Sequence, residues 1–307
     1  MISPRIGRRV GGGDVFSMAV WRIPLEVPDG GNLFSPDPDS DPELQKEIER
    51  AHSTFRFFLR ELEWENRRIV PGLGLACVKV PFCDPPSARK RSQEGPAVEQ
   101  MWVNEVSFDG KLVKGVLINS PHWLKSVKEG DDVEVPISGI SDWMYSVNDR
   151  VYGAYTVNYL RRKMSRGERK AHDNAWGLDF GDPDVIHVVP ADWSGKTLPK
   201  PGFFARIFGT APKLEPIDPD SCDHPMAINM GDSLKKHLKQ NPEAATEGDE
   251  RGWTMLHSMA VAGSETAVSI LLKHGADPNA ETTDGVTPRQ LAKTLGWKKV
   301  ARLLAGN

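Results

Sequence analysis

The chain has 307 residues, of which 39% are hydrophobic and 26% are charged, and this composition is typical of a soluble globular protein with two compact units. Its 39 basic and 42 acidic side chains leave a formal net charge of −3, which is too balanced for a general binder of nucleic acid. No stretch contains the roughly 18 apolar residues that a membrane helix needs, so we expect no membrane association.

The three cysteines, Cys77, Cys83 and Cys222, are too few for a disulfide framework, and no Cys-x-x-Cys pair is present to begin a zinc site. This cysteine content favours a reducing compartment, so we expect a cytoplasmic protein without a metal or another cofactor. Arg5, Arg8 and Arg9 precede no apolar run of the kind that a secretory signal requires, and we do not expect export.

Residues 1–40 are expected to form a disordered or extended segment, because Pro, Gly, Asp and Ser dominate its C-terminal third. A helix is predicted directly after it. From Leu44 to Leu62, apolar residues recur at steps of three and four, with charged residues such as Arg60 between them, and this spacing indicates an amphipathic helix. Asp41 can act as its N-cap, and Pro42 suits the first helical position.

Four segments rich in β-branched and aromatic residues are then predicted to be strands. They are Leu73 to Phe82, Met101 to Phe108, Leu112 to Ile118, and Asp132 to Ile137. Asp109-Gly110 lies between the second and third segments and favours a tight hairpin, because such a turn needs positive φ. A further short strand is predicted over Val151 to Val157.

The segment from Tyr159 to Trp176 is charged and helix-prone, and Ser165 can cap a second helical piece within it. A helix, an antiparallel meander and a second helical region predict an α+β domain over residues 41–182.

Residues 183–222 are rich in proline, which indicates a linker. Val185 to Val189 could add an edge strand within it, and the apolar residues from Phe203 to Phe208 could dock on a neighbouring element.

An internal repeat is the clearest signal in the sequence. Gly252-Trp253-Thr254-Met255-Leu256-His257 is followed 33 residues later by Gly285-Val286-Thr287-Pro288-Arg289-Gln290, and 33 residues is the ankyrin period. Leu271-Leu272, His274-Gly275-Ala276-Asp277 and Leu303-Leu304 complete the pattern. Residues 223–307 therefore resemble the ankyrin-repeat family, and the resemblance implies an all-α domain of turns and antiparallel helix pairs that pack on the next unit.

We interpret residues 223–307 as a degenerate first repeat followed by two recognisable ones. In the family, Thr of the Thr-Pro-Leu-His stretch caps a helix and His bonds across the turn, which implies these roles for Thr254 and His257. The second copy has Arg289 and Gln290 in place of Leu and His, as expected of a terminal unit. Because arrays generally need about three repeats, this one should depend on the linker or the first domain for stability.

Several separate motifs in residues 41–182 carry a second resemblance. They are His52-Ser53-Thr54-Phe55, Glu63-Trp64, Ala76-Cys77-Val78-Lys79, Glu99-Gln100-Met101-Trp102-Val103, Gly115-Val116-Leu117-Ile118-Asn119, Ile140-Ser141-Asp142-Trp143-Met144-Tyr145 and Gly153-Ala154-Tyr155-Thr156. They resemble a bacterial family known as domain-of-unknown-function family 2314, which implies no activity. Related small domains and ankyrin repeats are similar to proteins that neutralise toxins, and this analogy implies a binding role.

Tryptophan and tyrosine concentrate in the α+β domain, either as a sheet core or as the lining of a ligand cleft. We favour the core, because aromatic rings pack well on sheets. The candidate ligand or partner residues are Trp102, Trp123, Asp142, Trp143, Tyr145 and Tyr155. For Asp142, a buried acceptor of nearby amides is the favoured interpretation over a ligand contact.

An enzymatic alternative centres on His122, Glu99 and Asp142, although their spacing shows no shared geometry. His172 and Asp173 are neighbours on a predicted helix, where adjacent side chains point apart, so we do not expect them to form an orienting pair. The basic runs from Arg89 to Arg91 and from Arg161 to Lys170 favour a solvated surface over weak phosphate contacts.

The sequence therefore favours a non-enzymatic bacterial protein that binds another protein, with a toxin as one candidate partner, and no specific nucleic acid. The alternative is a small-ligand-binding protein or a hydrolytic enzyme with its site in the aromatic α+β domain. The candidate partner surface of the ankyrin repeats consists of Asp249, Glu250, Arg251, Trp253, Thr282, Thr283 and Asp284.

Overall fold

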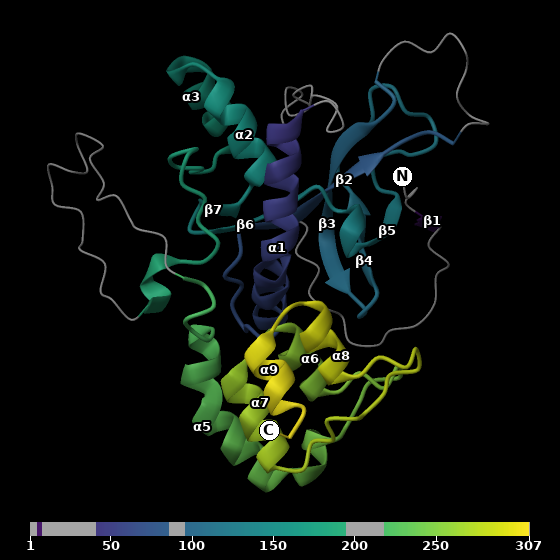
Figure 1. The fold of residues 1–307 in the computed structure, drawn as a ribbon, viewed down its shortest axis with the longest axis vertical. Helices are drawn as coiled ribbons and strands as arrows, with labels where there is room; N and C mark the ends of the chain where they lie inside the picture. Colours follow the sequence, from purple (N-terminus) through teal and green to yellow (C-terminus); the bar gives the residue numbers. More distant parts are fainter. Residues whose placement is uncertain (1–4, 8–40, 86–95, 195–217, 307) are drawn as a thin grey trace, which may run out of the picture. The chain divides into compact units, whose positions relative to one another are not determined.

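The computed structural model of this chain describes residues 5–7, 41–85, 96–194 and 218–306 (Figure 1). The chain divides into two compact units. Unit 1 consists of Met1–Phe58 and Glu65–Ile186, and unit 2 consists of Leu59–Trp64 and His187–Asn307. Within the described ranges, no helix is both long enough and apolar enough to cross a membrane.

Helix α1 (Pro42–Glu65) begins where the sequence predicts. A carboxylate oxygen of Asp41 accepts the amides of Glu43 and Leu44 at 3.1 and 3.2 Å, which confirms Asp41 as the N-cap, because the first amides of a helix lack internal partners. The apolar stripe of the helix is buried in unit 1, as Phe55 and Phe58 show.

Unit 1 contains an antiparallel sheet in the order β1-β5-β4-β3-β2-β6-β7. Its strands are β1 (Arg5–Gly7), β2 (Leu75–Phe82), β3 (Glu99–Phe108), β4 (Leu112–Leu117), β5 (Asp132–Pro136), β6 (Asp142–Val147) and β7 (Arg150–Gly153), and a short 3-10 turn, η2 (Ile137–Gly139), follows β5. Each of the pairings is antiparallel. The four longer predicted strands correspond to β2 through β5, and the predicted α+β class is confirmed.

The predicted hairpin joins β3 to β4, with Asp109 paired to Leu112 through a 3.2 Å backbone hydrogen bond. Gly110 has φ of 96° at the first central position of the turn, where a side chain would be strained. The Asp109 carboxylate also accepts the amides of Lys111 and Leu112.

At the end of the sheet, one predicted strand was too long and one strand was missed. The strand expected over Val151 to Val157 ends at Gly153, because Ala154 adopts the left-handed conformation (φ 57°) and helix α2 (Tyr155–Lys163) begins at the next residue. The prediction also lacked β6, whose first five residues are all buried. Such a strand shows no alternation of apolar and polar residues.

Helix α3 (Arg166–Trp176) confirms the prediction for Ser165, which forms a reciprocal capping box with Glu168. Residues 185–189 contain no strand, so the predicted edge strand was wrong. The predicted docking residues Phe203 to Phe208 and the basic run from Arg89 to Arg91 lie outside the described residues, as does nearly all of the 1–40 segment.

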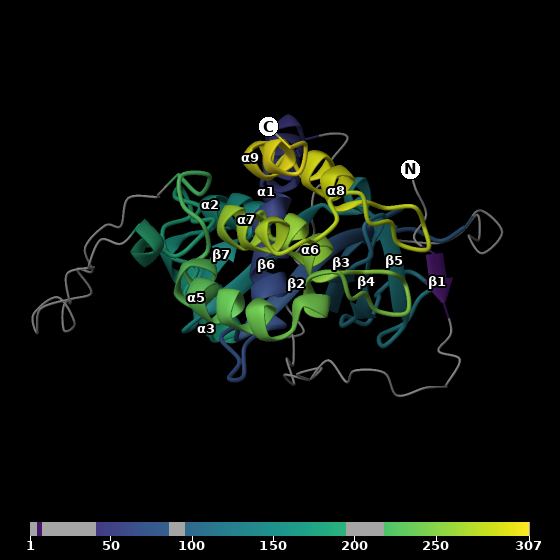
Figure 2. The same cartoon turned by 90° about the horizontal axis from the view of Figure 1, so that it is seen from below.

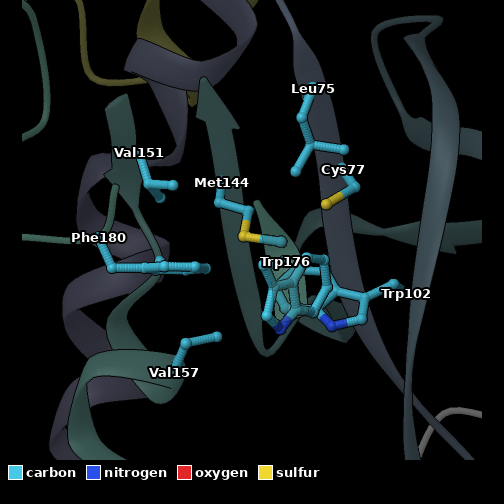
Figure 3. Close-up of a cluster of buried hydrophobic side chains, with 9 residues drawn as sticks. Leu75, Cys77, Trp102, Met144, Val151, Val157, Trp176 and Phe180 are labelled. Carbon is cyan, nitrogen blue, oxygen red and sulfur yellow. The ribbon is translucent and has the colours of Figure 1, made fainter. Parts of the chain in front are cut away.

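One face of the sheet and helices α2 and α3 enclose an apolar cluster (Figure 3). Trp102 and Trp176 meet edge to face, with ring centroids 6.3 Å apart, and Met144 and Cys77 lie beside them. Burial raises the pKa of the Cys77 thiol well above its usual value, so Cys77 is a core residue and not a reactive thiolate.

Unit 2 is helical. Its helices are α5 (Pro225–Gln240), α6 (Met255–Val261), α7 (Glu265–Lys273), α8 (Pro288–Thr294) and α9 (Lys298–Leu303), with short 3-10 turns η3 (Ala191–Ser194) and η4 (Pro242–Ala245). Helices α5, α7 and α9 pack in succession, and α6 packs on α8 (Figure 2). This is the two-layer stacking that an ankyrin array requires.

Unit 2 also includes Leu59–Trp64 of α1. Arg60 was predicted on the solvated face of that helix, but its side chain is 1% exposed, so this prediction was wrong. Its guanidinium carbon lies 4.9 Å from the ring centroid of Trp193 and 5.6 Å from that of Trp297. Aromatic faces attract a cation and so reduce the cost of burying it. The helical period alone does not predict that these two rings cover Arg60.

Candidate functional site

The first ankyrin hairpin tip is held by Asp249. One of its carboxylate oxygens accepts the amides of Arg251 at 2.9 Å and Trp253 at 2.8 Å, and the other accepts the Arg251 guanidinium. Burial opposes ionisation of this carboxylate, but the hydrogen bonds from the amides of Trp253 and Arg251 outweigh it and hold its pKa below the usual value. Asp249 therefore links the two ends of the tip, and the outer side chains of the tip are exposed.

The second tip repeats this arrangement one period later. Thr282 stands 33 residues after Asp249, and its hydroxyl accepts the amide of Val286 at 3.1 Å, just as Asp249 accepts the amide four residues ahead of it. Gly252 and Gly285 adopt positive φ, at 76° and 70°. Thr282 is itself buried, so it shapes the tip and presents little side-chain surface.

The two tips are joined directly. The amide of Thr283 donates to the carbonyl of Arg251 at 2.8 Å, which places the tips side by side in one surface. We call the exposed and half-exposed side chains on it the tip surface; they are Asp249, Glu250, Arg251, Trp253, Thr283 and Asp284. The sequence analysis did not predict this hydrogen bond. The 33-residue period is the signal that could have indicated it, because equivalent residues of stacked repeats lie next to each other.

Trp253 is half-buried at the base of the tip surface. Its indole nitrogen donates to the Ser258 hydroxyl at 3.0 Å, and its ring lies 5.3 Å from that of His257. The Arg251 guanidinium carbon is 5.9 Å from the ring centroid. A tryptophan held in this way offers a rigid aromatic face at little conformational cost.

His257 fixes the first tip to the second repeat. The amide and hydroxyl of Thr254 contact its Nδ1 at 3.1 and 2.9 Å, so Nδ1 accepts from the amide and Nε2 carries the proton that is donated to the carbonyl of Val286 at 3.1 Å. The capping role of Thr254 and the cross-turn bond of His257 are therefore confirmed. Burial lowers the pKa of His257.

The last repeat is closed in a similar way. Gln290 replaces the histidine and still forms a reciprocal capping box with Thr287. The indole nitrogen of Trp297 donates to the carbonyl of Val261 at 2.9 Å, and Gly263 (φ 64°) lies under the indole ring, where a Cβ atom would come within 2.3 Å of it. The side chains of His257 and Trp297 thus each donate a hydrogen bond to a backbone carbonyl of the other repeat.

In unit 1, most of the predicted ligand residues lie in the core. Trp143, Tyr145 and Tyr155 are at most 2% exposed, and Trp102 belongs to the apolar cluster. Trp143 stacks on Tyr145, which stacks on Tyr152, with centroids 6.1 and 5.0 Å apart. Trp123, in contrast, is half-buried in the loop before β5.

Asp142 is fully buried and acts as a hydrogen-bond acceptor. Its carboxylate accepts the amides of Trp143, Tyr155 and Thr156 at 2.8, 3.0 and 2.7 Å, as well as the Thr156 hydroxyl. The amides at the start of α2 therefore find a partner in β6. Lys79 donates to the same hydroxyl at 2.9 Å and lies 4.7 Å from the Trp102 ring centroid, and burial lowers the pKa of Lys79.

The comparison with known proteins agrees with this architecture. Residues 41–180 match the family described as "Uncharacterized protein conserved in bacteria (DUF2314)", and residues 251–283 match the ankyrin repeat. Over 265 residues the chain is 38% identical to the putative ankyrin repeat protein NMB1133/NMB1171 of Neisseria meningitidis serogroup B, which covers 86% of this chain and 94% of that protein. The chain belongs to the same family as this meningococcal protein. Both resemblances seen in the sequence are confirmed.

Shorter similarities accompany this match. The chain is 34% identical to the uncharacterized protein YegJ of Escherichia coli over 62 residues, which is 20% of this chain and 40% of that protein. It is 38% identical to the 2-5A-dependent ribonuclease of Mus musculus over 64 residues, which is 20% of this chain and 9% of the ribonuclease.

In this family member, two of the three residues of the enzymatic alternative, Glu99 and Asp142, accept backbone amides. Glu99 accepts the backbone amides of His122 and Trp123 at 3.1 and 2.5 Å. These bonds hold the loop and do not involve the imidazole ring of His122. Asp142 is occupied at the start of α2, as described above. Among the described residues, no three His, Cys, Asp or Glu side chains are grouped in a way that could hold a metal ion.

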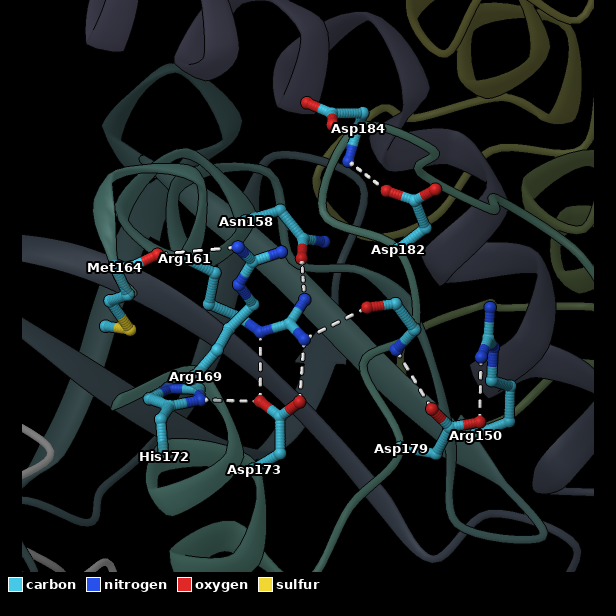
Figure 4. Close-up of polar contacts among 11 residues, drawn as sticks. Arg150, Asn158, Arg161, Met164, Arg169, His172, Asp173, Asp179, Asp182 and Asp184 are labelled. Carbon is cyan, nitrogen blue, oxygen red and sulfur yellow. Dashed lines mark hydrogen bonds and ion pairs between the residues drawn. The ribbon is translucent and has the colours of Figure 1, made fainter. Parts of the chain in front are cut away.

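The prediction that His172 and Asp173 point apart was wrong. Nδ1 of His172 lies 2.9 Å from a carboxylate oxygen of Asp173 (Figure 4). The same carboxylate binds the guanidinium of Arg161 through two hydrogen bonds of 2.9 and 2.6 Å, and Arg161 is 1% exposed. Arg161 turns the carboxylate toward the helix, within reach of the imidazole, and the expected solvated surface for this basic run was wrong at Arg161.

Proposed function

We propose that this chain binds a protein partner through the tip surface of its ankyrin repeats. The observation that carries the proposal is the bond from the Thr283 amide to the Arg251 carbonyl, because it joins two hairpin tips into one continuous surface. Ankyrin arrays offer extended surfaces of this kind for binding.

The tip surface is organised in advance for a partner. Asp249 and Thr282 satisfy the amides of their own tips, so little conformational freedom remains to be lost on association. Trp253 and Arg251 are of the residue types that contribute most to binding at protein interfaces. Glu250 and Thr283 are exposed and complete the surface with polar groups.

The proposal is confined to protein binding. No contact among the described residues points to a toxin as the partner. The proposal therefore does not include toxin neutralisation. The enzymatic alternative is not favoured either, because the carboxylates of Glu99 and Asp142 accept backbone amides of unit 1. The aromatic residues of that domain support its core packing.

Site-specific photo-crosslinking tests the proposal in cells. A photoreactive amino acid placed at Glu250 or Thr283 is expected to capture the same protein, whereas placement at Glu49, an exposed residue of α1, is expected not to capture it. The captured protein is then purified, and its affinity for the full chain is measured by calorimetry.

Charge variants provide the matched control. Glu250→Arg with Thr283→Arg adds the same charge as Asp232→Arg with Gln240→Arg, and all four positions are exposed. We expect the first pair to weaken binding at least tenfold and the second to leave it unchanged. Equal affinity for both variants, with the fold retained by circular dichroism, would refute the tip surface as the binding site.

A further inference from the structure

Acidic side chains dominate the two hairpin tips. Segments 247–251 and 281–284 contain five carboxylates and one guanidinium, a net charge of −4, whereas the whole chain carries only −3. The acidic residues are Glu247, Asp249, Glu250, Glu281 and Asp284, and all are exposed. The one base, Arg251, is already paired with Asp249 at 3.2 Å.

The helices of the last repeat have the opposite charge. Residues 288–306 contain no acidic residue and five basic ones, which are Arg289, Lys293, Lys298, Lys299 and Arg302. Of these, Lys299 pairs with Glu265 of α7 at 3.0 Å. The negative charge of the tips is therefore a local property and not a general feature of unit 2.

These carboxylates are not arranged as a cation site. No three such groups converge in the described part of the chain, and Asp249 is occupied by two amides and a guanidinium. The charge is spread over two tips around the half-exposed indole of Trp253. A face that combines separated carboxylates with an aromatic ring suits several cationic side chains at once, because an aromatic ring also attracts guanidinium and ammonium groups.

We propose that the partner presents a lysine- and arginine-rich segment to the tip surface. This inference rests on the proposed function and names the chemistry of its partner. Phosphate groups would be repelled here, so a nucleic acid does not fit this surface. The negative field of the tips also attracts a basic segment before contact and thus raises the association rate.

Fluorescence anisotropy with the full chain tests the inference. The probes are three labelled peptides of equal length, one rich in lysine and arginine, one rich in aspartate and glutamate, and one neutral. We expect binding of the basic peptide alone, and we expect its affinity to fall when NaCl rises from about 50 mM to about 300 mM, because salt screens exposed charges.

Paired variants locate the contact. Glu250→Gln with Glu281→Gln removes two charges from the tips, and Glu49→Gln with Asp232→Asn removes two exposed charges elsewhere. Because an exposed ion pair contributes roughly 0.2–1 kcal/mol, we expect the tip variant to bind the basic peptide about 2- to 30-fold more weakly. The control variant should bind it like the wild type.

Each outcome has a distinct meaning. Equal binding of all three peptides, or equal weakening in both variants, would overturn the inference that the partner is basic. If that happens while crosslinking at Glu250 and Thr283 still captures one protein, the proposed function stands and only the partner chemistry is wrong. If the crosslinks also fail, the tip surface is not a binding site.

Discussion

The imidazole Nε2 of His224 lies 3.1 Å from a carboxylate oxygen of Glu61, and both residues are 1% exposed. His224 also accepts the amide of Met226 through Nδ1, which caps α5. Trp64 stacks on the imidazole with ring centroids 5.3 Å apart. Two residues of α1 therefore belong to the buried core of unit 2.

We expect Glu61→Ala to destabilise unit 2 by about 3 kcal/mol, because it leaves a buried polar partner without its counterpart. Glu49→Ala removes an exposed carboxylate from the same helix and should change the stability by less than about 0.5 kcal/mol. Urea unfolding followed by tryptophan fluorescence measures both. Equal effects would show that the Glu61 contact does not stabilise the repeats.

His257 makes the stability of unit 2 depend on pH. Its folded pKa is lowered by burial, so the unfolded chain binds a proton more readily than the folded chain. The contribution of neutral His257 to the stability of unit 2 is therefore fully present above the unfolded pKa of about 6.5. It decreases as the pH falls below that value.

The variant His257→Gln tests this dependence. Gln290 already performs the capping role in the second copy, so glutamine is expected to keep the cap and remove the titrating group. We expect part of the pH dependence between about pH 7 and pH 5 to disappear in unfolding experiments. An unchanged slope would assign the pH dependence to other groups.

Gly263 and Gly275 provide a matched pair. Both have positive φ, at 64° and 90°, but a Cβ at Gly263 would come within 2.3 Å of Trp297, whereas nothing lies within 4 Å of one at Gly275. Gly275→Ala should cost roughly 1–2 kcal/mol from backbone strain alone. Gly263→Ala should cost about 2 kcal/mol more, because the Trp297 ring must shift, and thermal unfolding measures the difference.

Asp142 is expected to stabilise unit 1 without contacting a ligand. Asp142→Asn removes the charge beside buried Lys79 and one acceptor for the amides of α2, so we expect a loss of about 3 kcal/mol. Combining it with Lys79→Met should restore part of this loss. Hydrogen exchange of the amides in β2 and β6 reports the effect. Unchanged protection of these amides in Asp142→Asn, or no recovery of protection in the double variant, would contradict this prediction.

Local signals in the sequence predicted much of the fold. The caps at Asp41 and Ser165 and the turn at Gly110 depend on residues that are close in the chain, so their chemistry can be read without a tertiary structure. The ankyrin repeats could also be predicted from the sequence, because a 33-residue period requires that equivalent positions stack. The tip surface follows from the same period.

Other features depend on partners that are distant in the chain. Strand β6 carries no periodic signal because it is buried on both faces, and Arg60 follows the polar spacing of a surface helix although Trp193 and Trp297 cover it. Asp173 reaches His172 because Arg161 draws its carboxylate inward. Burial and charge pairing between remote residues are properties of the packed chain, and only the tertiary structure reveals them.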